Sequence, residues 1–300
     1  MDEEREMGAA KGYRLDFAPH LGFPTPETPL FAALVGDASP DAQIAFAAAR
    51  GFRRVQDPFA AQRSETEQAR IGALAKAAGL GLGCFVYAPM DRAVQPSWSA
   101  VDPAGRGALD AEVEGAIGIG RRLGSRYIAV LTGTDPARTR AEQRGAMTAN
   151  LARLADRVAE AGMMLCVEAV NAQRLPQMLL HHLADAVEVV RGADHPAVRL
   201  IFDTAHVQAM DGDILGNLDR AWDLIELIQL ADHPGRVEPG VGELNFTRIL
   251  DEIERCGFAG PVELEHGWAV ASAEAQEQYL HWLGRWSSGE ERTAYGDAAA

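Results

Sequence analysis

The chain has 300 residues, of which 47% are hydrophobic, and a formal net charge of −15. This length suits two ordinary domains or one large α/β barrel, and the hydrophobic fraction is normal for a globular protein with a sizeable core. The acidic balance argues against a general nucleic-acid-binding surface, which needs clustered Lys and Arg facing the phosphates.

The ends of the chain and its cysteines predict a cytoplasmic protein. Residues 1–12, MDEEREMGAAKG, are acidic and lack the apolar run of a secretory signal, and no uncharged apolar stretch is long enough for a membrane span. The three cysteines are widely spaced, as expected for reduced thiols rather than a disulfide framework. Small and polar residues at the ends predict flexible tails at 1–11 and 287–300, leaving one domain at 12–286.

Strand-like and helix-like runs alternate between these tails. Eight runs have strand character: 13–23, 51–59, 80–89, 125–133, 163–171, 198–206, 224–232 and 261–268. Ala-rich segments with apolar residues at helical spacing separate them, and several end on a glycine just before the next strand: Gly51, Gly79, Gly124, Gly162 and Gly257. Strands alternating with helices imply parallel pairing through right-handed crossovers.

Eight such units in about this length predict a single closed (β/α)₈ TIM barrel in the α/β class, whose typical size is roughly 250 residues. A doubly wound open sheet is the alternative. It fits less well, because no Gly-rich phosphate-binding turn follows the first strand.

Four oxygen-bearing side chains stand at the ends of the last four strand-like runs: Glu168, Asp203, Gln229 and Glu265. The C-terminal ends of barrel strands carry the catalytic groups, while the opposite rim mainly serves stability. Side chains alternate along a strand with a period of two, so an inward orientation of all four makes them converge on the barrel mouth.

These four residues predict a metal site. Each alone is more often a cap or a surface ion pair, but all four follow apolar runs that would bury them, and buried carboxylates need a cation or hydrogen bonds. An all-oxygen set favours Mg²⁺ or Mn²⁺ over Zn²⁺. A structural network without metal is the alternative, and Glu263, on the same strand face as Glu265, is either a supporting group or the ligand itself.

A divalent ion at this place would hold a carbonyl and an adjacent hydroxyl oxygen of a substrate. This lowers the pKa of the C–H bond beside the carbonyl and stabilises an enediolate. Glu168 and Glu265, on either side of the ion, would remove and return the proton.

Several motifs resemble one known family. EAVN, FDTAHVQAMDGD, QLADHPGRVEPGVGELNF and ELEH together are similar to the hydroxypyruvate isomerase branch of the xylose-isomerase-like TIM barrels. The similarity is strong from about residue 162 to 268 and general before that, and its most specific part runs from Gln229 to Phe246. It implies a divalent metal held by the four residues above, and proton exchange by Glu168 and Glu265. It also implies that His206 and Arg236 contact substrate oxygens. Family relatives are often dimers or tetramers, so a homo-oligomer is possible, although no segment of this sequence marks an interface.

The residue types of His206 and Arg236 agree with that implication. An imidazole in a βα loop can donate to a substrate oxyanion, and a guanidinium in a short Pro- and Gly-rich loop can hold a carboxylate at two points. The alternatives are a helix-entry histidine bonded to backbone, and an ion pair of Arg236 with Glu238 or Glu243.

The predicted function is a metal-dependent aldose–ketose-type isomerase that acts on a small molecule, with hydroxypyruvate to tartronate semialdehyde as the leading reaction. Sugar 3-epimerisation, 2-oxo-tetronate isomerisation and dehydration of a keto-cyclitol share its first step. A metal-dependent endonuclease is a remote alternative, because that chemistry needs several histidines and a basic groove. A sugar-binding protein without catalysis is a third.

Overall fold

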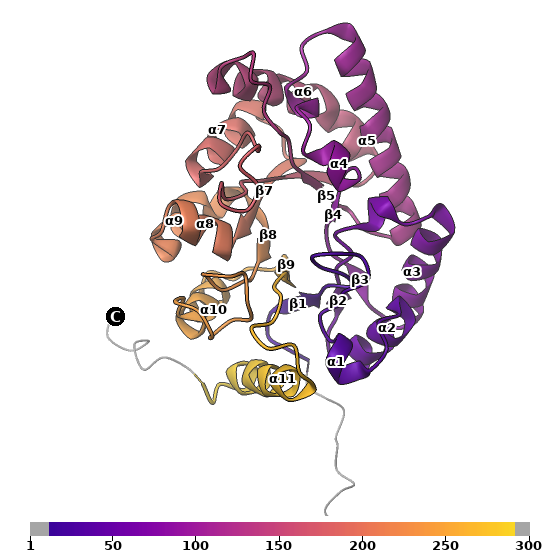
Figure 1. The fold of residues 1–300 in the computed structure, drawn as a ribbon, viewed down its shortest axis with the longest axis vertical. Helices are drawn as coiled ribbons and strands as arrows, with labels where there is room; N and C mark the ends of the chain where they lie inside the picture. Colours follow the sequence, from indigo (N-terminus) through magenta and orange to yellow (C-terminus); the bar gives the residue numbers. More distant parts are fainter. Residues whose placement is uncertain (1–11, 292–300) are drawn as a thin grey trace, which may run out of the picture.

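The computed structural model describes residues 12–291. Helices form a ring around the strands (Figure 1). The strands are β1 (Asp16–Pro19), β2 (Arg54–Val55), β3 (Gly81–Leu82), β4 (Phe85–Val86), β5 (Tyr127–Val130), β6 (Met164–Glu168), β7 (Val198–Asp203), β8 (Ile225–Gln229) and β9 (Pro261–Leu264). The helices are α1 (Ala32–Val35), α2 (Pro40–Ala49), α3 (Glu65–Ala77), α4 (Met90–Ala93), α5 (Pro103–Leu123), α6 (Arg140–Glu160), α7 (Leu183–Ala193), α8 (Thr204–Met210), α9 (Ile214–Ala221), α10 (Phe246–Arg255) and α11 (Ala273–Ser288).

The strands form one closed parallel barrel. Seven of them pair in the order β1-β9-β8-β7-β6-β5-β4, and β2 pairs with β3. The third predicted strand contains both β3 and β4, which contact β2 on one side and β5 on the other. Backbone hydrogen bonds of Gln56 to Pro19 (2.9 Å) and of Leu21 to Gln56 (2.7 Å) join β1 to the end of β2. The predicted TIM barrel is therefore confirmed.

The helices cover the barrel because their sequences present one apolar side. In α6, Thr139 and Glu142 form a capping box at the start, and the buried side chains include Met147, Leu151, Leu154 and Val158 at spacings of three and four. The glycines expected to end helices all have a left-handed backbone, with φ between 71° and 81°.

The limits of the predicted domain stay a prediction. Helix α11 continues to Ser288, two residues beyond the predicted end at 286. The predicted tail at 1–11, and its C-terminal counterpart from 292 onward, lie outside the described residues. Within 12–291, no helix is both long and apolar enough to cross a membrane.

One layer of the barrel interior is polar. Asp203, Gln229 and Glu263 lie at the same level of β7, β8 and β9, because Asp203 pairs with Gln229 and Gln229 with Glu263. Glu263 is fully buried, and its carboxylate accepts hydrogen bonds from the backbone N–H (2.6 Å) and the thiol (3.0 Å) of Cys84. The strand break between β3 and β4 thus supplies a backbone donor to a buried carboxylate.

Gly83 makes room for that carboxylate, and this predicts a stability effect. A Cβ atom at Gly83 would collide with Oε1 of Glu263. We expect Gly83→Ala to lower the free energy of unfolding by about 1–3 kcal/mol, because the core there is already filled. Urea denaturation measures this change in the free energy of unfolding.

The matched control is Gly115→Ala in α5, where an added Cβ meets nothing within 4 Å. There alanine should stabilise by about 0.5–1 kcal/mol through its higher helix propensity. Equal behaviour of the two variants would contradict the assigned role of Gly83.

Candidate active site

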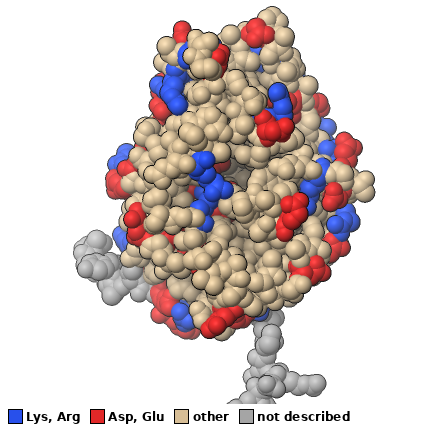
Figure 2. Space-filling model, in the orientation of Figure 1, with Lys and Arg blue, Asp and Glu red and all other residues tan. Residues whose placement is uncertain are grey.

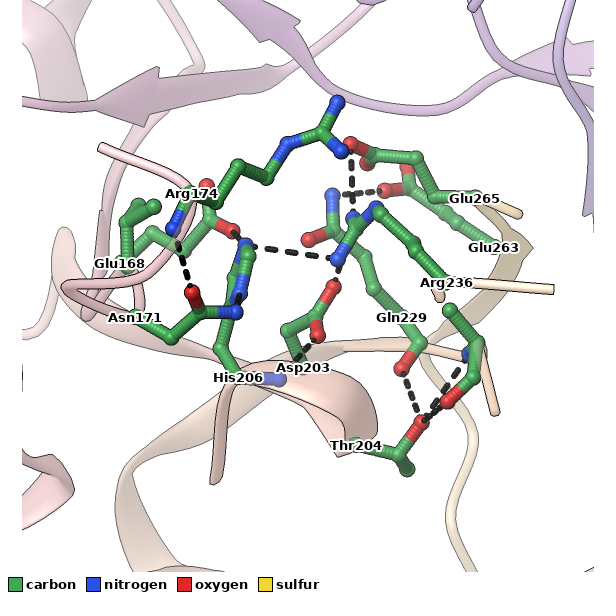
Figure 3. A network of polar contacts seen from close by, with 12 residues as sticks. Glu168, Asn171, Arg174, Asp203, Thr204, His206, Gln229, Arg236, Glu263 and Glu265 are labelled. Atoms are coloured by element: carbon green, nitrogen blue, oxygen red, sulfur yellow. Dashed lines mark hydrogen bonds and ion pairs between the residues drawn. The ribbon is translucent and has the colours of Figure 1, made fainter. Parts of the chain in front are cut away.

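The predicted site residues meet at the C-terminal mouth of the barrel, beside a pocket of about 480 Å³. Glu168, His206, Arg236 and Glu265 line this pocket, while Asp203 lies beneath it with 1% exposure. Figure 3 shows their side chains pointing toward one another. The rest of the wall is largely apolar and includes Phe23, Phe59, Val86, Leu131, Val170 and Leu175.

The mouth carries a compact group of metal-capable atoms. One ligand atom each from Glu168, Asp203 and His206 lies within 4.8 Å of the others, and all three residues are buried. Gln229 adds an amide oxygen at the end of β8. Glu265 is connected to the group through Arg236.

Arg236 lies among the carboxylates. Its Nη2 atom donates to Asp203 Oδ2 (2.8 Å) and to Glu265 Oε1 (3.1 Å). The expected alternative partners are engaged elsewhere, since Glu238 accepts from the backbone of Ala269 and Glu243 from Gln208. Arg236 is therefore a buried cation that shares one amino group between two carboxylates.

The loop after β8 is shaped to direct Arg236 inward. Arg236 has a left-handed backbone (φ 54°), which is strained for a residue with a side chain and needs support from its surroundings. The support comes from Asp232, whose carboxylate accepts four backbone N–H groups, those of His233, Gly240, Gly242 and Leu244, at 2.8–3.0 Å. Asp232 is fully buried.

Glu263 orients the amide of Gln229. The Nε2 atom of Gln229 donates to Glu263 Oε2 (3.1 Å), and this fixes which end of the amide carries the oxygen. The Oε1 atom of Gln229 is buried and has no hydrogen-bond partner among the described residues. A buried amide oxygen without a partner is costly, so this atom is suited to a ligand.

Burial and crowding perturb the titration of the carboxyl groups. Burial, with the charges of Glu265 and Asp203, raises the pKa of Glu168 well above its usual value. Burial also raises the pKa of Glu265, against the opposing effect of Arg236. Burial alone would raise the pKa of Asp203, but Arg236 and His206 hold it below its usual value. Such perturbed carboxyls in a cleft are typical of functional sites.

The hydrogen bonds around His206 define its tautomer. Asn171 accepts from the backbone N–H of Arg174 with its oxygen (2.8 Å), so its Nδ2 donates to His206 Nδ1 (2.8 Å). Burial lowers the pKa of His206 to about 3, so the ring is neutral and its proton is on Nε2. Nε2 lies 3.5 Å from Glu168 Oε1. In this state His206 is a donor toward the pocket and not a metal ligand. Arg236 Nη1 lies 3.3 Å from the same nitrogen, so two N–H donors face each other there.

The remaining donors are oxygen atoms, the ligand type that a hard divalent cation prefers. Glu168, Asp203 and Glu265 provide carboxylate oxygens, and Gln229 provides the unpartnered amide oxygen. The negative charge of these carboxylates exceeds what the single guanidinium of Arg236 neutralises. The structure therefore contains a set of residues able to hold a metal ion.

Comparison with known proteins places the chain in a family. Residues 44–286 match the family described as xylose isomerase-like TIM barrel. The chain belongs to the xylose isomerase-like TIM barrel family.

Two curated relatives in this family are isomerases. The chain is 29% identical over 244 residues to a 2-oxo-tetronate isomerase of Cupriavidus necator, covering 81% of this chain and 93% of that protein. It is 29% identical over 155 residues to the hydroxypyruvate isomerase of Escherichia coli, covering 51% of this chain and 60% of that protein. The predicted resemblance and the isomerase class of enzyme are confirmed at this level.

A solved structure confirms the fold. The crystal structure of an AP endonuclease, family 2, from Brucella melitensis has a TM-score of 0.75, with 22% identity, and the similarity covers 89% of this chain and 99% of that one. At this identity the likeness concerns the barrel alone.

Sequence reasoning missed the residues that hold the site in place. Gln56 donates to Glu265 Oε2 (2.9 Å), Asn171 orients His206, and Asp232 organises the loop of Arg236. The sequence contained one usable signal: Asn171 follows Glu168 by three residues, as His206 follows Asp203. Gln56 gave no such signal, because its partner is 209 residues away.

The tautomer of His206 can be tested with Asn171→Asp. A carboxylate at this position can only accept a hydrogen bond, so it favours a proton on Nδ1. We therefore expect the Nε2–H form of the original protein to be replaced by an Nδ1–H form or by the imidazolium. The ¹⁵N chemical shifts of the imidazole report which nitrogen is protonated.

Asn245→Asp is the matched control, because Asn245 caps α10 through its oxygen and aspartate caps equally well. It should leave the His206 signals unchanged. A protonated Nδ1 in the unmodified protein would refute the assignment.

Proposed function

We propose that this protein is a divalent-metal-dependent isomerase of a small 2-oxo acid that carries a hydroxyl on C3. The leading reaction is hydroxypyruvate to tartronate semialdehyde, and 2-oxo-tetronate undergoes the same change. In both, a proton leaves C3, a cis-enediolate forms, and a proton is returned to C2, so that the carbonyl moves from C2 to C3.

One observation carries this proposal: two buried carboxylates, Glu168 and Glu265, lie on opposite sides of a group of hard oxygen donors (Figure 3). Each is at the C-terminal end of its strand, where barrel enzymes place their chemistry. A group that removes a proton and another that returns it must reach the substrate from separate positions, and the separate positions of Glu168 and Glu265 support this division of roles.

The residues that would hold the ion are Glu168, Asp203, Gln229 and Glu265. Their oxygens favour Mg²⁺ or Mn²⁺. A divalent ion at this place supplies polarisation of the carbonyl, which makes the neighbouring C–H more acidic.

The chain's own groups handle the proton and the charge. Burial raises the pKa values of Glu168 and Glu265, and a carboxylate with a raised pKa is a stronger base. The Nε2–H of His206 donates to the oxygen on which negative charge develops, without itself ionising. Arg236 holds Asp203 and Glu265 in place and contributes positive charge beside them.

The relatives support the choice of substrate class. The 2-oxo-tetronate isomerase of Cupriavidus necator is matched along 93% of its length, and this supports the four-carbon acid as a candidate beside hydroxypyruvate. The pocket of about 480 Å³ admits either acid. A 3-epimerase or a dehydratase would begin with the same loss of a proton, and the product distinguishes them.

The two-base mechanism predicts the effect of removing either carboxylate. Incubation in heavy water with hydroxypyruvate or 2-oxo-tetronate should put deuterium on the product carbon, detected by NMR. We expect Glu168→Gln and Glu265→Gln each to lower this exchange by about 10³-fold or more, because an amide cannot take up the proton.

The control for these variants is Glu160→Gln, an exposed residue at the end of α6, which should keep full exchange. Retention of exchange in either active-site variant would disprove the two-base mechanism. Exchange without isomer formation would indicate the epimerase or the dehydratase.

Removal of metal gives an independent prediction. A chelator should lower exchange to background, and added Mg²⁺ or Mn²⁺ should restore it. Equilibrium dialysis of the protein without substrate should show about one ion bound per chain, with affinity lowered about 10- to 100-fold by Asp203→Asn. Asparagine keeps the Oδ1 acceptor that caps α8 at His206 N but loses the acceptor of Arg236 Nη2, so circular dichroism must first show that the variant is folded.

Asp219→Asn on the exposed face of α9 is the control for metal binding. Metal-independent turnover, or unchanged affinity in Asp203→Asn, would count against the proposed donor set.

A further inference from the structure

A second arginine projects over the site without an acidic partner. Arg174 lies in the loop after β6 and lines the pocket. Its side chain extends across the cluster, above Glu168 and toward Glu265 (Figure 3). Figure 2 shows Lys or Arg atoms along one side of the hollow on this face.

The base of Arg174 is fixed while its guanidinium remains available. The backbone N–H donates to Asn171 Oδ1 (2.8 Å), which ties the residue to the support of His206. The guanidinium carbon lies 4.9 Å from the ring centre of Phe23. Among residues 12–291, no hydrogen bond or ion pair is formed by this guanidinium.

Phe23 contacts two cations. The guanidinium carbon of Arg236 lies 5.1 Å from the same ring centre. Burial lowers the pKa of Arg174, and the charge of Arg236 lowers it further. The aromatic ring stabilises both charges, and the nearby carboxylates of Glu265, Asp203 and Glu168 offset part of the repulsion between the two arginines.

The two arginines differ in the donors they have left. The Nη2 of Arg236 is shared between Asp203 and Glu265, whereas Arg174 lines the pocket and its guanidinium forms no hydrogen bond or ion pair within residues 12–291. A guanidinium fork of this kind matches a carboxylate at two points. The carboxylates below repel an anion, so the carboxylate of a substrate acid is favoured where a cation offsets that repulsion, and Arg174 extends above these carboxylates.

We propose that Arg174 binds the carboxylate of the substrate and thereby selects acids over neutral ketoses. This inference rests on the proposed function and adds its specificity determinant. Arg236 then acts on the carboxylates of the protein, and Arg174 on the carboxylate of the substrate.

A matched pair of substrates tests the role of Arg174. Erythrulose is 2-oxo-tetronate with CH₂OH in place of the carboxylate, so the two differ only in the group that Arg174 would bind. We expect Arg174→Gln to lower kcat/KM for 2-oxo-tetronate by about 100-fold, mainly through KM, and to change that for erythrulose by less than about threefold. Arg174→Lys should recover part of the loss, since it keeps the charge without the fork.

Arg106→Gln, at an exposed position of α5, controls for the change in net charge and should leave both substrates unaffected. An equal loss for acid and neutral substrate in Arg174→Gln would overturn the proposal in favour of a general structural role. An unchanged value for the acid would overturn it as well.

Binding of unreactive analogues separates this inference from the proposed function. Erythronate and erythritol differ in the same group and need no turnover, so calorimetry can follow them even if the protein exchanges no C–H bond. We expect the preference for erythronate to fall about 10-fold or more in Arg174→Gln. Equal preference in the original protein and the variant would refute the role of Arg174, whatever the reaction is.

Discussion

The crowding of carboxylates in the barrel mouth is the constraint on which the rest of this structure depends. Glu168, Asp203, Glu263 and Glu265 are all buried, and Arg236 is the one Lys or Arg of the described chain within ion-pair distance of any of them. Moving an ion out of water costs several kcal/mol even after relaxation. An arrangement so unfavourable for folding agrees with the proposed cation-dependent activity, which needs these oxygens close together.

The surrounding backbone is organised to reduce that cost. The backbone N–H of Cys84 donates to Glu263 at the strand break. The carboxylate of Asp232 accepts from four backbone N–H groups, and this shapes the loop so that Arg236 points into the site. Both devices use a charged acceptor with backbone donors, which is stronger than a neutral hydrogen bond. They also make the site stiff, and a stiff donor set keeps the oxygens in position before any substrate arrives.

The sequence predicted those parts of the site that depend on local periodicity. The end of a strand and a period of two suffice to turn Glu168, Asp203, Gln229 and Glu265 toward one mouth, and the structure brings them there. Gln56 could not be found, because its role depends on barrel closure between distant strands. The engagement of Arg236 by Asp203 and Glu265 was missed for the same reason: spacing indicates that a loop reaches the mouth, but not which partner it meets.

The overall charge of the chain and the charge of its proposed substrate have the same sign. The formal net charge of −15 produces a long-range electrostatic field that opposes the approach of a small acid. At physiological ionic strength this field is screened within about 8 Å, so the groups at the rim determine the final potential. Arg174 lies at that rim, above carboxylates that a metal would neutralise. Within residues 12–291 its guanidinium forms no hydrogen bond or ion pair. Under the proposed function, an acid would therefore meet local positive charge at the last step of entry.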